Sequence, residues 1–225
     1  MQIKKIIENQ TFDEERALYN IQNTEVRNCT FAGPQDGESV LKETRQVRVD
    51  HCTFSLRYPL WHVQGYELIH SSLDELTRAP IWYSHHGLID SCDIQGIKIL
   101  RECSDTIVSN CQIQSPEFGW FCQDISIKDS EIHSEYMLLH SQHVKIDHLK
   151  FTGKYSFQYM HDLEITNSYL DTKDAFWHSS NVIVKDSVVK GEYLGWFSKN
   201  VTFINCQIIG TQPLCYCENL KLIVK

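Results

Sequence analysis

The sequence predicts an all-β fold, a single-stranded right-handed parallel β-helix of about eleven coils of 19–21 residues. Two observations predict it. Short phrases that alternate apolar and polar residues recur along the whole chain, and the small residue within each phrase returns at a nearly constant interval. These small residues are Cys29, Cys52, Ser71, Cys92, Cys111, Ser130, Leu149, Ser168, Ser187 and Cys206. The last six of their nine steps are each 19 residues long.

A repeat of this length cannot bury its apolar side alone, so successive coils must stack and pair in parallel. Parallel crossovers are right-handed in nearly all proteins, which gives the hand. We expect residues 1–225 to form a single β-helix domain. Residues 1–12 are expected to be an N-terminal cap, with the segment 3–7 lying over the first coil, and the last coil is incomplete at Lys225.

Two polar columns mark the corners of the coil. One precedes the small residues and includes Asn28, Asn110 and Asn167, and the other includes Asn23, Asp105 and Asn181. Such side chains tolerate tight-turn backbone angles. The nine cysteines fall mostly in inward columns beside serines, so we expect inert core thiols rather than disulfides or metal ligands.

Several phrases resemble a known family. They are EERALY, LKETRQV, YPLWH, RAPIWY, KDAFWHSSNV, GEYLGWFSKN and PLCYCENL, and they cover nearly the whole chain. In this order and spacing they are similar to the bacterial domain-of-unknown-function family 3737. The resemblance implies a pectin-lyase-like β-helix. It implies no activity.

Composition excludes several classes of partner. The formal net charge of −8, with no clustered basic tract, argues against nucleic acid and anionic membranes as partners. No apolar stretch is long enough to span a membrane, and the N-terminus lacks a signal-peptide pattern, so we expect a cytoplasmic protein. His51 and His70 are the one histidine pair on adjacent coils of a column, and we interpret them as turn residues. No metal and no cofactor are predicted.

All five tryptophans fall in one further column, which we call the tryptophan column. It comprises Tyr19, Lys42, Trp61, Trp82, Arg101, Trp120, Leu139, Gln158, Trp177, Trp196 and Cys215. Its charged members predict that the column points outward. The column that follows it, from Glu43 to Tyr216, has a mixed composition and is also expected to be exposed. Exposed apolar strips mark binding surfaces. The predicted ligand-binding residues are Lys42, Glu43, Trp61, Trp82, Arg101, Trp120, Trp177 and Trp196.

Three functions stand as hypotheses. The leading one is a non-catalytic module that binds a saccharide or a protein through the tryptophan face. The alternatives are a polysaccharide hydrolase or lyase and a structural or assembly scaffold. The enzyme hypothesis requires a close carboxyl pair, and Asp174 with Glu192 on the next coil is the pair to consider.

The C-terminal strand predicts an oligomer. Residues 220–225 leave one strand edge unpaired, and Leu222, Ile223 and Val224 are apolar. Such edges favour association. We therefore expect a homodimer joined through the C-terminal coils, with two-fold symmetry.

Overall fold

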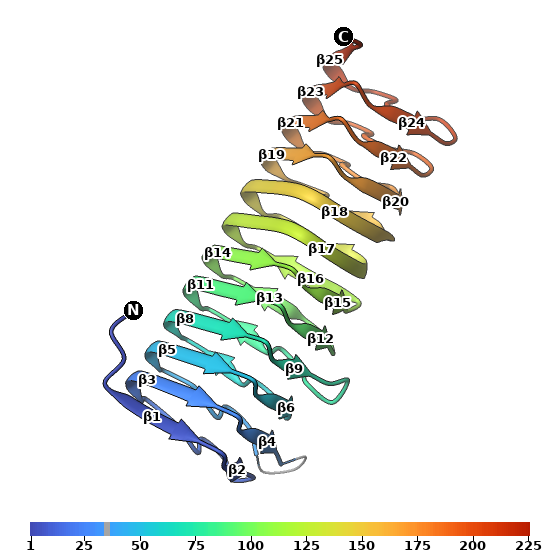
Figure 1. Ribbon diagram of the computed structural model, residues 1–225. Coiled ribbons are helices and arrows are strands. Elements are labelled where there is room, and N and C mark those ends of the chain that lie inside the picture. The colour runs from blue at the N-terminus through green and yellow to red at the C-terminus, as the bar shows by residue number, and fades with distance from the viewer. Residues whose placement is uncertain (34–36) are drawn as a thin grey trace.

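The computed structural model describes residues 1–33 and 37–225, which form a right-handed parallel β-helix of about eleven turns (Figure 1). The chain climbs coil by coil from the N-terminus at one end to the C-terminus at the other. All 25 strands of the described residues belong to one sheet, which winds around the core. The predicted fold class is therefore confirmed. In the described residues, no helix is long and apolar enough to cross a membrane.

The first of three runs of strands is continuous along the whole helix. Its strands pair in parallel, so that Ile146 lies between Ile127 and Ile165 of the neighbouring coils. The strands are β1 (Lys5–Glu8), β3 (Gln22–Arg27), β5 (Arg45–Asp50), β8 (Gln64–Ile69), β11 (His85–Asp90), β14 (Ser104–Ser109), β17 (Gln123–Met137), β18 (Gln142–Ser156), β19 (His161–Thr166), β21 (Ser180–Lys185), β23 (Lys199–Ile204) and β25 (Glu218–Ile223).

The second run follows the first after a short turn, and β17 and β18 continue through both runs. Its other strands are β2 (Thr11–Phe12), β4 (Thr30–Ala32), β6 (Thr53–Ser55), β9 (Ser72–Leu73), β12 (Asp93–Gln95), β15 (Gln112–Gln114), β20 (Tyr169–Lys173), β22 (Val188–Lys190) and β24 (Gln207–Ile209). The third run has four short strands, and a turn replaces it in most other coils. They are β7 (Leu60–Trp61), β10 (Ile81–Trp82), β13 (Ile99–Arg101) and β16 (Glu117–Trp120).

The core consists of the side chains that alternate inward along these strands. Phe31 and Phe54 are buried and stack with their ring centroids 4.8 Å apart. All nine cysteines are free, and six of them are buried. Burial raises the pKa of the Cys52 thiol to about 12, so this thiol stays protonated. The expectation of core thiols is confirmed for these six cysteines, whereas Cys206, Cys215 and Cys217 are half-buried.

Both polar columns bend the chain through left-handed backbone conformations, as predicted. Asn28 has φ 52° and Asn167 has φ 50° in the column that precedes the small residues, hereafter the turn column. In the second polar column, Asn23 has φ 50° and Asp162 has φ 56°. Asn and Asp adopt this conformation more readily than other non-glycine residues. The polar residues therefore occupy these positions because the backbone turns there.

The structure corrects the expectation of an N-terminal cap that lies over the first coil. Lys5–Glu8 forms β1 and pairs in parallel register with β3, while Thr11–Phe12 forms β2 and pairs with β4. These residues are thus part of the first coil and do not lie across it. The physical reason is that the segment continues the alternating pattern, burying Ile7 against the core and exposing Ile6. The homodimer through the C-terminal coils stays a prediction.

Candidate functional site

The tryptophan column is half-buried, and its side chains brace neighbouring coils. Trp82 Nε1 donates a hydrogen bond to the backbone carbonyl of Lys98, 3.0 Å away and one coil further on. Trp120, Trp177 and Trp196 donate in the same way, and Gln158 Nε2 replaces the indole donor at 2.7 Å. Gln158 therefore fits the column because it carries the same N–H donor.

The cations of this column cover the indole faces. Lys42 Nζ lies 5.0 Å from the ring centroid of Trp61. The Arg101 guanidinium lies 5.2 Å from Trp82 and 5.6 Å from Trp120, so it is held between two indoles. Such cation–π contacts stabilise by about 0.5–1 kcal/mol at exposed sites. The structure thus brings the predicted residues of this column together, with their polar groups turned to the chain itself.

The next position along each coil forms an exposed column, which we call the ring column. Its members are Glu43, His62, Tyr83, Glu102, Phe121, His140, Tyr159, His178, Phe197 and Tyr216. The last six stack without interruption, with centroid separations from 4.6 to 5.4 Å. Phe121 and Tyr159 are each 45% exposed. The predicted exposure is confirmed for eight of the ten members, whereas Tyr83 and Glu102 are half-buried.

The backbone of the ring column is left-handed throughout. Phe121 has φ 55°, Tyr159 has φ 54° and Phe197 has φ 59°. This conformation disfavours bulky L residues by roughly 1–2 kcal/mol each. The two polar columns meet the same requirement mostly with Asn, Asp, His and Gly, whereas five of the ten ring-column residues are Phe or Tyr. Strained positions of this kind are concentrated at functional sites.

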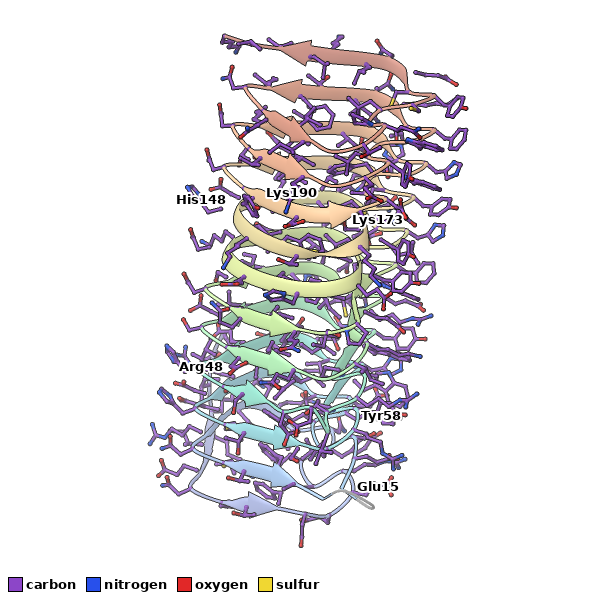
Figure 2. The ribbon with its side chains drawn as sticks, turned by 90° about the vertical axis from the view of Figure 1, so that its right-hand side faces the viewer. Glu15, Arg48, Tyr58, His148, Lys173 and Lys190 are labelled. Carbon is purple, nitrogen blue, oxygen red and sulfur yellow. The ribbon has the colours of Figure 1, made fainter. Side chains whose placement is uncertain are left out.

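Figure 2 locates the aromatic side, by which we mean the tryptophan column and the ring column together. Tyr58 and Lys173, which lie three and four residues before tryptophan-column residues, are at one edge of the stack. Arg48 and His148, near the turn column, lie at the opposite edge. The aromatic side and the polar turn are therefore separate surfaces.

A groove of about 760 Å³ crosses β14, β17, β18, β19 and β21. His143 lies between two carboxylates in it, with Nδ1 3.3 Å from Asp124 and Nε2 3.4 Å from Asp162. A hydrogen bond from Asn181 holds the pKa of Asp162 below its usual value. Exposed Ile107 and Ile183 add apolar surface.

The candidate catalytic pair has unequal surroundings. Glu192 is held in an ion pair, with Oε2 3.1 Å from Lys173 Nζ, as expected for opposite charges on adjacent coils. Asp174 is half-buried, and its Oδ1 has no hydrogen-bond partner among the described residues. Burial raises the pKa of Asp174, with Lys173 opposing and Glu192 reinforcing the shift. Neither carboxyl lines the groove across β14–β21.

Sequence reasoning missed the groove and the continuity of the ring stack. The sequence does contain a signal for the groove. One outward position of the coil is charged in several coils, as at Arg48, Glu67 and Lys145. In other coils it is apolar, as at Leu88, Ile107 and Ile183. The ring stack has a signal too, because its last six members are all His, Phe or Tyr.

The comparisons with known proteins agree with this fold. A family model described as protein of unknown function (DUF3737) matches residues 5–224. No curated protein matches the chain. The crystal structure of PfbA, a surface adhesin of Streptococcus pneumoniae, is similar at 9% identity and a TM-score of 0.51, over 90% of this chain and 71% of that one.

A second similar structure is a mutant tailspike protein of E. coli bacteriophage HK620, solved in complex with a hexasaccharide. The match has 9% identity and a TM-score of 0.42, and it covers 92% of this chain but 54% of the tailspike chain. This chain therefore spans about half the length of the tailspike chain. At such identities the likeness to solved structures extends to the fold alone.

Proposed function

We propose that this chain, which belongs to the DUF3737 family of proteins of unknown function, is a non-catalytic module that binds a saccharide along its aromatic side. The single observation that carries the proposal is the stack of six exposed rings from Phe121 to Tyr216, all in left-handed backbone positions. Smaller polar residues would relieve the backbone strain. Large rings at these positions are therefore best explained by what they contact.

The orientation of the rings defines the contact. Each of the four inner rings, from His140 to Phe197, stacks on the rings of the coils above and below, so both of its faces are covered and its edge meets solvent. The edge of an aromatic ring carries partial positive charge and attracts oxygen atoms. Tyr159 and Tyr216 add hydroxyl groups to this strip, and His140 and His178 add ring nitrogens. These groups suit hydroxyl-rich ligands.

The regular spacing favours a polymer with a regular repeat. The ring column offers one edge per coil, at about 4.8 Å intervals, along the axis of the helix. A saccharide chain laid along the axis can repeat the same contact on successive coils. A folded protein surface has no such repeat and needs a wider patch, since a specific interface buries about 800 Å² on each partner.

The residues of the tryptophan column support this strip in the proposal. Trp120, Trp177 and Trp196 position the ring column from the preceding residue, and Arg101 lies 5.4 Å from the Phe121 ring at the end of the stack. Lys42, Glu43, Trp61 and Trp82 extend the same side toward the N-terminus. A cytoplasmic location stays a prediction.

The experiment is a glycan array with the wild-type chain and a Tyr159→Asn, Phe197→Asn double variant. Asparagine suits the left-handed backbone, so the variant is expected to fold. We expect wild type to bind a defined set of glycans and the variant to lose that binding. Tyr169→Asn, which removes an exposed ring on another face, is the matched control. Equal binding by the wild type and the double variant, or capture of proteins but no glycan, would contradict the proposal.

The hydrolase or lyase hypothesis has two observations in its favour. The pKa of Asp174 is raised, and its Oδ1 atom has no hydrogen-bond partner in the part of the chain that the structure describes. A carboxyl with a raised pKa beside an ionised one is the arrangement of a general acid. The assay is release of reducing ends or unsaturated products from a panel of polysaccharides. An activity that persists in Asp174→Asn and Glu192→Gln would exclude these residues as the catalytic pair.

A further inference from the structure

We propose that Asp50, His51 and His70 form a binding site for a divalent transition metal ion, with zinc as the representative ion. The site lies on the turn column, on the edge of the stack that Figure 2 marks with Arg48, away from the aromatic side. It is independent of the saccharide proposal.

The ligand atoms already converge. Asp50 Oδ1 lies 2.7 Å from His51 Nδ1 and 3.0 Å from His70 Nδ1. One candidate ligand atom from each of the three side chains lies within 4.8 Å of the others. Within residues 1–33 and 37–225, no other three His, Cys, Asp or Glu side chains form such a group.

Other coils place different residues at the same positions around an aspartate. Comparing them shows which features of the Asp50 cluster belong to the turn and which suit a metal ion. Asp147 Oδ2 lies 2.9 Å from His148 Nδ1, and Asp147 Oδ1 accepts a hydrogen bond from Asn167 Nδ2 at 2.8 Å. Asp90 accepts hydrogen bonds from Ser91 and Asn110 in the same way. A carboxylate that holds two turn residues is therefore a recurring structural device of this helix.

The pair of imidazoles distinguishes the Asp50 cluster. An imidazole can carry its proton on Nε2 and offer the Nδ1 lone pair to a metal ion. An amide nitrogen, such as that of Asn167, has no lone pair to offer. Asp50 with two histidines therefore supplies three ligands, whereas Asp147 with His148 supplies two.

The distances and exposure allow coordination. Zinc bonds of about 2.0–2.2 Å in a tetrahedron place the ligand atoms roughly 3.3 Å apart, so each ring must move outward by about 0.5 Å. The His51 and His70 side chains are 62% and 49% exposed, which leaves them free to move and leaves a fourth position open to water. Two imidazoles and a carboxylate suit zinc, copper or nickel better than calcium or magnesium.

The surrounding charges permit a cation. The Asp50 carboxyl group brings one acidic side chain to the site, and it is 18% exposed. Arg48 Nη2 lies 3.9 Å from the other carboxylate oxygen, Oδ2. Arg48 Nη1 is paired with Glu67 at 3.0 Å, which offsets the positive charge.

His143 shows why proximity of acids and histidine is insufficient. It contacts Asp124 through Nδ1 and Asp162 through Nε2, on opposite sides of its ring. Its two carboxylates therefore cannot meet at one ion. In the Asp50 cluster both rings present the same nitrogen to one oxygen.

The test is calorimetric titration of the full chain with Zn²⁺, together with the absorption spectrum of the Co²⁺ complex. We expect one ion per chain and a weak-absorbing N/O spectrum. His51→Asn and His70→Asn should each weaken binding by more than about tenfold, since even outer-shell substitutions can cost that much. His148→Asn, at the same turn position of another coil, should leave affinity unchanged.

Asn167→His provides the gain-of-function arm, because it places two histidines around Asp147 at the coil positions that His51 and His70 occupy around Asp50. We expect it to raise the stoichiometry to two ions per chain. Unchanged stoichiometry, an affinity insensitive to His70→Asn, or intense thiolate charge-transfer bands from cysteine ligation would each overturn the proposal. Matching unfolding transitions of the variants show that loss of binding is not loss of fold.

Discussion

Trp177 and Trp196 lie on neighbouring coils with their ring centroids 5.5 Å apart and their planes 4° apart, so each indole covers one face of the other. Their Nε1 groups donate to the backbone carbonyls of Tyr193 and Gln212. One face and the polar atom of each indole are therefore used within the chain. The tryptophan column stabilises the stacking of coils, and a ligand on the aromatic side meets chiefly the ring column.

This difference in roles predicts a contrast between two tryptophans. Trp177→Phe removes a donor and leaves the Tyr193 carbonyl without that bond, so we expect a loss of about 1 kcal/mol in the free energy of unfolding. Trp61 Nε1 is buried without a partner in the described residues, so Trp61→Phe should be neutral or stabilising. Urea unfolding measures both. Equal losses for the two variants would show that packing, not the hydrogen bond, governs the column.

Asp147 predicts an acid-dependent contribution to stability. A hydrogen bond from Thr166 Oγ1 at 2.6 Å, followed by one from Asn167, lowers the pKa of Asp147 to about 2. Because the folded-state pKa is below the unfolded value of about 3.9, the contribution is full above that value and is lost as pH falls toward about 2. Thr166→Val should raise the Asp147 pKa, measured by carbon-detected NMR titration. An unshifted titration in this variant would contradict the assignment.

Asp174 predicts the opposite pH dependence. Its folded-state pKa is raised, chiefly by burial, so ionisation destabilises the folded chain as pH rises through that pKa. Asp174→Asn removes this penalty, and asparagine tolerates the left-handed backbone at φ 51°. We expect the variant to be at least as stable as wild type at neutral pH and no more stable below the unfolded pKa. Thermal unfolding of both chains at the two pH values tests this expectation. If the variant is less stable than wild type at neutral pH, the Asp174 carboxylate has a stabilising partner and the expectation is wrong.

Much of the fold could be predicted from the sequence, because a parallel register repeats the same chemical requirement on every coil. Asn28 and Asn167 mark a turn, as the structure confirms. The repeat predicts which positions share a column. It does not predict how far each side chain is buried, because burial depends on its neighbours along the axis.

The parts that could not be predicted depend on contacts between coils. Tyr66 is fully buried because Gly87, its partner in the next coil, has no side chain, and a Cβ on Gly87 would lie 2.2 Å from the Tyr66 ring. The convergence of His51 and His70 on Asp50 likewise requires the rotamers of three side chains. The sequence places His51 and His70 on adjacent coils and says nothing of where their nitrogens point.

The most direct test of the saccharide proposal is equilibrium binding of the best array glycan to wild type, to the Tyr159→Asn, Phe197→Asn variant and to the control Tyr169→Asn. Binding along the ring column predicts a loss of more than about tenfold in affinity for the double variant, equivalent to more than about 1.4 kcal/mol. The same mechanism predicts unchanged affinity for Tyr169→Asn, which removes an exposed ring on another face. Equal affinity of wild type and the double variant, with both chains folded, would contradict it.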